Sequence, residues 1–65
     1  MLGERLKKYR RERGLTQIQL GALAGIHNIT ISEWERGHVD GIKLESLNKL
    51  ATALDVKVSD LIDAD

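Results

Sequence analysis

The stretch LTQIQLGALAGIHNITISEWERG, residues 15–37, predicts two short helices joined by a tight turn. Thr16 and Gln19 have the spacing of a capping box, in which the N-cap and the third helical residue satisfy each other's backbone amides. Gly25 interrupts the helical pattern, because glycine accepts the backbone conformation of a tight turn at no steric cost. A second helix then runs toward Trp34, so two helices follow each other within this stretch.

Two helices joined in this way form a helix-turn-helix unit, which can present its second helix to the major groove of DNA. Ile31 and Trp34 share the inward face of the second helix. Its N-cap must be His27 or Asn28, and capping preferences favour Asn28. Gly21 lies in mid-helix, where glycine costs about 1 kcal/mol relative to alanine. We therefore expect the second helix to cross close to Gly21.

Three further helices complete the predicted fold, which is all-α with five helices in one domain over residues 1–65. The second helix of the helix-turn-helix unit is expected to span residues 28–36, and the apolar spacing predicts the three further helices over residues 2–13, 44–54 and 58–62. The apolar stripe of the fourth helix consists of Leu44, Leu47, Leu50, Ala51 and Leu54.

Composition excludes several classes of function. The 65 residues include no cysteine, so neither a disulfide nor a thiolate zinc site is expected. The two histidines have no carboxylate pair near them, which leaves no catalytic or metal site, and we expect no cofactor. No apolar run is long enough to span a membrane, and no signal-peptide pattern follows Met1. These features favour a cytoplasmic protein without an evident small-molecule effector.

Charge is unevenly distributed although the net charge is zero. Residues 1–38 carry seven lysines and arginines and four acids, a net charge of +3. Residues 39–65 carry three lysines and six acids, a net charge of −3. The first half could therefore meet phosphate, although a solvated surface with chance asymmetry explains the same counts.

Several motifs in register resemble the Cro and lambda-repressor type of helix-turn-helix domain, the xenobiotic-response-element family of prokaryotic transcriptional regulators. They are Leu15-Thr16-Gln17, Gly25-Ile26, Thr30-Ile31-Ser32 and Trp34-Glu35-Arg36-Gly37, with Leu44-Glu45-Ser46-Leu47 and Asp60-Leu61 further on. The resemblance implies a compact five-helix domain of prokaryotic, phage or plasmid origin that binds operator DNA, commonly as a two-fold dimer. Two departures concern the second helix: His27 stands where serine or threonine usually begins it, and Glu33 where a basic residue or glutamine is common.

The residues expected to meet double-stranded DNA are Gln17, His27, Asn28, Ile29, Thr30, Glu33, Arg36, His38 and Lys43. Asn28 can bond adenine through two hydrogen bonds, unless it only caps the helix, and Ile29 suits a thymine methyl group. Glu33 could accept a hydrogen bond from cytosine or pair with Arg36. Thr30 could bond phosphate, a base or its own helix backbone.

Phosphate contacts are expected on both sides of the second helix. The resemblance implies one from Gln17, at a helix N-terminus whose free amides favour anions, although a solvated glutamine is the alternative. Arg36, His38 and Lys43 could neutralise the DNA backbone on the far side of the groove.

The resemblance also implies a structural pair between Arg10 and Glu35. We expect a partly buried ion pair that ties the first helix to the third, with two independent surface charges as the alternative. A domain this small reads few base pairs, so we expect a homodimer on half-sites about one helical turn, roughly 34 Å, apart. The residues predicted for its dimer surface are Val56, Val58, Leu61 and Ile62, unless they close the core of the monomer.

The sequence therefore predicts a sequence-specific DNA-binding regulator, most simply a repressor that occupies an operator without chemistry. Two alternatives remain: a protein-interaction module on the same fold, and an antitoxin or controller protein that binds DNA to regulate its own synthesis. Ile18 and Leu23 favour the interaction module slightly. They are apolar residues of the helix that follows Thr16, at positions that are usually polar.

Overall fold

Five helices make up the computed structural model, which describes residues 2–62. In chain order they are α1 (Leu2–Glu12), α2 (Gln17–Ala24), α3 (Asn28–Glu35), α4 (Leu44–Leu54) and α5 (Val58–Ile62). The all-α prediction is confirmed, and α4 and α5 have the predicted bounds. Helices α1 and α3 end one residue earlier than predicted, because Arg13 and Arg36 already belong to the turns that close them.

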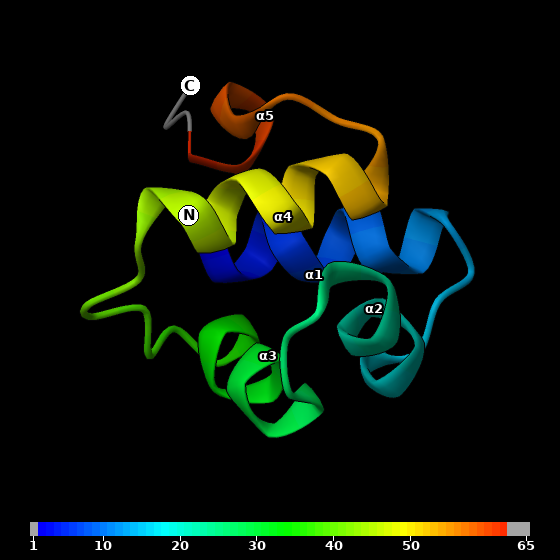
Figure 1. Cartoon of the computed structure of the whole chain (residues 1–65), viewed down its shortest axis with the longest axis horizontal. Helices are drawn as coiled ribbons and strands as arrows, with labels where there is room; N and C mark the ends of the chain where they lie inside the picture. The colour runs from blue at the N-terminus through cyan, green and yellow to red at the C-terminus, as the bar shows by residue number, and fades with distance from the viewer. Residues whose placement is uncertain (1, 63–65) are drawn as a thin grey trace.

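Helix α4 crosses the middle of the molecule, with α5 on one side of it and the α2–α3 pair on the other (Figure 1). Helix α1 packs against α3 and α5, α2 packs against α3 and α4, and α5 also contacts α4. The α2–α3 unit and α5 thus occupy opposite ends of the fold. A ligand at one end leaves the other end accessible.

The core receives at least one fully buried side chain from every helix. These side chains are Leu6, Leu20, Ile31, Leu50, Leu54 and Leu61. Each contributes about 1.5–3 kcal/mol by leaving water, which is how so short a chain closes a core. Leu44, expected in the apolar stripe of α4, is instead 65% exposed at the first residue of that helix.

The dimer surface predicted on α5 needs one correction. Leu61 is fully buried within the core of the monomer, so a second copy cannot contact it. Val56 and Val58 are half-buried and pack against the same core, whereas Ile62 is 52% exposed. Of the four predicted residues, only Ile62 offers a largely open apolar side chain.

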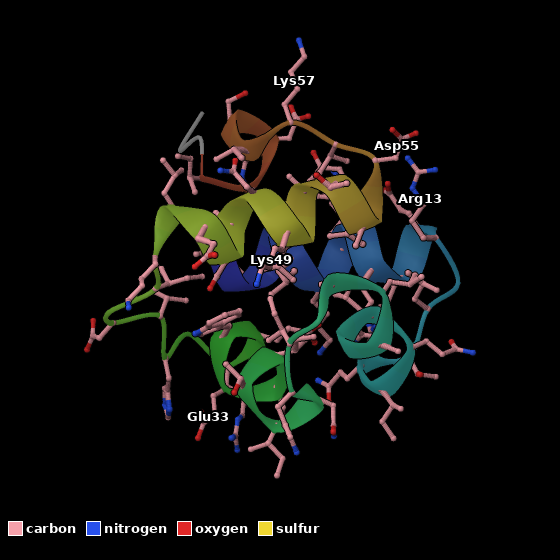
Figure 2. All side chains as sticks on the ribbon, in the orientation of Figure 1. Arg13, Glu33, Lys49, Asp55 and Lys57 are labelled. Atoms are coloured by element: carbon pink, nitrogen blue, oxygen red, sulfur yellow. The ribbon has the colours of Figure 1, made fainter. Side chains whose placement is uncertain are left out.

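Two arginines, one in α1 and one in the turn that follows it, fasten the region around α5. Arg5 Nη1 donates a hydrogen bond to the carbonyl oxygen of Asp60 over 3.0 Å. Arg13 Nη2 donates to the carbonyl oxygen of Asp55 over 3.3 Å and lies 3.7 Å from its carboxylate (Figure 2). Because both bonds join residues more than 40 positions apart, they hold the end of the described chain against its start.

Two helical glycines lie where another backbone passes close by. A Cβ atom at Gly21 would collide with the carbonyl oxygen of Ile26, and one at Gly3 with the carbonyl oxygen of Trp34. The close approach expected at Gly21 is therefore present, but the neighbour is the turn rather than the body of α3. Because neither glycine has a side chain, the turn lies directly against α2, and α3 lies directly against α1.

Candidate nucleic-acid interface

The first helix of the α2–α3 unit begins at the predicted capping box. Thr16 Oγ1 accepts a hydrogen bond from the Gln19 amide over 3.0 Å, and the Thr16 amide donates to Gln19 Oε1 over 2.9 Å. Gly25 ends the helix in the left-handed conformation, with φ of 70°. The sequence prediction for this helix is confirmed at both ends.

Helix α3 begins at Asn28, as predicted, and its N-cap is the less favoured of the two candidates. His27 is the N-cap, and its Nδ1 accepts a hydrogen bond from the Ile29 amide over 3.1 Å. The turn places His27 at the cap. The Ile26 amide donates to the Gly21 carbonyl oxygen, and the His27 carbonyl oxygen accepts the first backbone hydrogen bond of α3, from the Ile31 amide. Asn28 is thus the first helical residue, as the predicted range 28–36 had it, and of the two candidate caps the structure has His27, which capping preferences favoured less.

The two faces of α3 are divided as the spacing predicted. Ile31 is fully buried and Trp34 is half-buried against the core. The opposite face consists of exposed His27, Ile29 and Glu33, with half-exposed Asn28 and Thr30. Glu33 projects from α3 away from the other helices (Figure 2). The outer face of α3 can therefore enter a groove without displacing any part of the domain.

Basic and polar groups continue past the end of α3. Arg36, His38 and Lys43 are all exposed, as a contact with the DNA backbone requires. Within residues 2–62, no ion pair joins Glu33 to Arg36, so the carboxylate of Glu33 is available on the outer face.

An ion pair between Arg10 and Glu35 joins α1 to α3. Arg10 Nε lies 2.6 Å from Glu35 Oε2, and Arg10 Nη2 donates to Glu35 Oε1 over 3.0 Å. The two side chains are only 10% and 4% exposed. Arg10 Nη1 also donates to the Leu15 carbonyl oxygen over 2.7 Å, a bond that sequence reasoning missed. The guanidinium therefore ties α1 to α3 and to the segment that leads into α2.

Gln17 joins the same group rather than extending into solvent. Its Nε2 donates to Glu35 Oε1 over 3.1 Å, which no local sequence signal indicated. An amide nitrogen carries two N–H bonds, so one donor remains for a phosphate oxygen. Three helices thus converge on the Glu35 carboxylate, and Gln17 is held at the N-terminus of α2.

A groove between α2 and α4 lies beside the helix-turn-helix unit. Its lining residues are Leu23, Ala24, Asn48, Lys49, Thr52 and Ala53. Ile18, the other large exposed apolar residue of α2, does not line this groove.

The sequence profile of the Helix-turn-helix family matches residues 6–61. The chain belongs to this family. It is 35% identical over 63 residues to the HTH-type transcriptional regulator SinR of Bacillus subtilis (strain 168). The alignment covers 97% of this chain and 57% of SinR, so the chain spans little more than half of that relative.

Three solved structures share the fold of this helix-turn-helix domain. SinR in complex with DNA superposes with a TM-score of 0.91 at 35% identity, covering 97% of this chain and all of that one. The P22 c2 repressor in complex with a synthetic operator superposes with a TM-score of 0.90 at 32% identity, covering 100% of this chain and 97% of the repressor chain. The restriction-modification controller protein C.AhdI from Aeromonas hydrophila superposes with a TM-score of 0.87 at 36% identity, covering 94% of this chain and 91% of the C.AhdI chain. The fold is therefore the five-helix, lambda-repressor-like domain, in a family of transcriptional regulators rather than enzymes.

Two features are absent from the described residues of this helix-turn-helix domain. Residues 2–62 contain no group of three histidine, cysteine or acidic side chains that could hold a metal ion. Over the same residues, no helix has the length and apolar character needed to cross a membrane.

The Glu35 carboxyl gives this helix-turn-helix domain a predicted acid sensitivity. Burial acts to raise the pKa of Glu35, but hydrogen bonds from Arg10 and Gln17 and the charges of Arg10 and Lys7 hold the pKa below its ordinary value. A group whose pKa is lowered by folding stabilises the native state above its unfolded-state pKa, and this contribution disappears as the pH falls through the native-state pKa.

We therefore expect the wild type to lose stability faster than Glu35→Gln below about pH 4, by up to about 1.4 kcal/mol per pH unit. Urea unfolding at pH values from 6 to 2.5 measures this difference. Other carboxyl groups titrate in both proteins, so parallel curves for the two would contradict the assignment to Glu35.

Proposed function

We propose that this domain is a sequence-specific double-stranded DNA-binding protein that acts as a transcriptional regulator, most simply a repressor occupying a two-fold operator. The observation that carries the proposal is the outer face of α3, which is exposed along one side while Ile31 and Trp34 hold the other side in the fold. SinR and the P22 c2 repressor have this fold in structures with DNA, which supports the same use here.

Base recognition is assigned to three residues of α3. Asn28 is not used as the N-cap, which leaves its amide to bond adenine through two hydrogen bonds. Ile29 is 59% exposed at the next position, where a thymine methyl group is its natural partner. Glu33, one turn further on, would accept a hydrogen bond from the amino group of cytosine. Thr30 stands between them and bonds phosphate or a base edge.

Phosphate contacts are assigned to the two flanks of α3. On one side, Gln17 offers its second amide N–H beside the free backbone amides at the start of α2. On the other side, Arg36, His38 and Lys43 would neutralise phosphates. His27, at the start of α3, lies between the two flanks.

Selection of bound duplexes from a random pool tests the proposal. We expect Asn28→Ala and Glu33→Ala each to relax preference at one base pair, with a loss of about 1–3 kcal/mol in discrimination. Lys43→Ala is the matched control, since removing one phosphate contact weakens all duplexes alike and reduces the salt slope by about 0.9. Unchanged base preference in both α3 variants would contradict the assignment.

A two-fold homodimer would extend recognition to two half-sites about one helical turn apart. Within residues 2–62, Ile62 and Leu44 are the exposed large apolar residues outside the α2–α3 unit, and half-buried Val56 and Val58 shortly precede Ile62 in the sequence. A duplex with two half-sites should then bind more tightly than a duplex with one half-site.

A second candidate function is a protein-interaction module, favoured by the zero net charge and by the apolar groove at Leu23. Titration with random duplex at low salt separates the two, because a DNA-binding domain retains non-specific affinity there. Likeness to C.AhdI also supports a controller role, in which DNA binding regulates the protein's own gene.

A further inference from the structure

Most of the helix-turn-helix unit contains a single titratable side chain. Residues 14–32, which span α2, the turn and most of α3, include no lysine, arginine, aspartate or glutamate, and their one histidine is His27. Other charges come from the elements packed around this stretch. They include Glu33 and Glu35 near the end of α3, Arg10 and Lys7 of α1 through their interactions with Glu35, and Lys49 of α4 beside the groove of α2. Proton uptake at the start of α3 therefore falls on His27.

The hydrogen bond at His27 requires a neutral ring. Nδ1 accepts from the Ile29 amide over 3.1 Å, so the ring carries its single proton on Nε2. A protonated imidazole has an N–H on both nitrogens and cannot accept this bond. Its positive charge would also oppose the partial positive charge at the N-terminus of α3. Protonation of His27 thus removes the cap, whereas a serine, threonine or asparagine cap would persist.

We propose that His27 is a positioning residue for the base-reading face, and that its protonation uncaps α3 and lowers discrimination between operator and random DNA. The inference rests on the proposed function. The first turn of α3 carries Asn28 and Ile29, so loss of its cap loosens the residues assigned to base contacts. The charged ring still attracts phosphate, so binding to random duplex persists while binding to the operator falls. Histidine is the side chain that changes charge between pH 5 and 8.

Two substitutions at one position separate capping from titration. His27→Asn keeps a strong N-cap that does not titrate, and His27→Ala removes the cap at every pH. His38→Asn is the control for the second histidine, which is exposed beyond the end of α3. Nuclear magnetic resonance of the free protein follows the Ile29 amide and the imidazole protons from pH 8 to pH 5.

We expect the Ile29 amide shift to follow the titration of His27 in the wild type and in His38→Asn, but to stay constant in His27→Asn. As the pH falls from 7.5 to 5.5, the ratio of operator to random-duplex affinity should fall in the wild type by up to about fivefold, which is the limit set by one N-cap. The ratio should stay level in His27→Asn and be low at both pH values in His27→Ala.

The proposal is overturned if Ile29 remains unaffected while His27 titrates, or if the ratio falls as far in His27→Asn as in the wild type. The proposed function has a separate failure. If Ile29 follows His27 but no duplex is bound at low salt at either pH, the cap is proton-sensitive as inferred and the domain is not a DNA-binding protein.

Discussion

Replacing Arg10 with methionine is expected to lower the free energy of unfolding by about 3–5 kcal/mol. The substitution leaves the Glu35 carboxylate, whose side chain is 4% exposed, without its two hydrogen bonds from the guanidinium. It also removes the donor to the Leu15 carbonyl oxygen. A buried charge without a partner costs more than the pair contributed when intact, which is why the effect is large.

Urea unfolding followed by circular dichroism measures this loss. Arg13→Met is the matched control, because the Arg13–Asp55 pair spans 3.7 Å on the surface and such pairs contribute about 0–1 kcal/mol. A domain of this size has only about 3–10 kcal/mol of stability, so Arg10→Met could be largely unfolded at 25 °C. The double variant Arg10→Met/Glu35→Leu removes both charges and should be more stable than Arg10→Met. Arg10→Met within 1 kcal/mol of the wild type would contradict the prediction.

The same substitution should weaken DNA binding beyond its effect on folding. Glu35 accepts hydrogen bonds from both Arg10 and Gln17, so a displaced carboxylate also releases the side chain assigned to a phosphate. Comparison of folded fractions with affinities at low temperature separates the two losses. The structural pair and the phosphate contact proposed for Gln17 thus belong to one arrangement of side chains in this domain.

Structural features that depend on a few neighbouring residues were predicted correctly from the sequence. The capping box of Thr16 and Gln19 and the stop at Gly25 depend on neighbours within one helical turn, and each is present. The His27 cap shows the limit of such reasoning, since preferences favoured asparagine. The bond between the Ile26 amide and the Gly21 carbonyl oxygen, outside α3, fixes where that helix begins.

Contacts between distant residues needed the structure. Gln17 and Glu35 lie 18 positions apart, and nothing in the spacing of either residue indicates their hydrogen bond. The Arg10–Glu35 pair was expected only through the family resemblance. Leu61 illustrates a different limit, because an apolar residue in a short helix suits either the core of the monomer or a dimer surface. Its complete burial decides for the core.

Gly21→Ala is expected to destabilise the domain by about 3 kcal/mol, toward the upper end of the range for overpacking. The new methyl group would overlap the carbonyl oxygen of Ile26 and would lie in contact with the amide nitrogen of Asn28, 3.4 Å from the Cβ position. The overlapping oxygen is a backbone atom, so no side-chain rotation relieves the clash. The turn must move instead, and α3 with it.

The sign of this change is the decisive measurement, because helix propensity alone predicts that Gly21→Ala stabilises α2 by about 1 kcal/mol. Gly14→Ala provides the matched control: its φ of 68° disfavours alanine by about 1–2 kcal/mol, but no atom beyond its two chain neighbours lies within 4 Å of the new methyl group. Gly21→Ala should therefore be the less stable variant in urea and should also lose affinity for selected duplexes at temperatures where it is folded. A stabilised Gly21→Ala would mean that the turn does not lie against α2, and the placement of Asn28 and Ile29 for base contacts would lose its support.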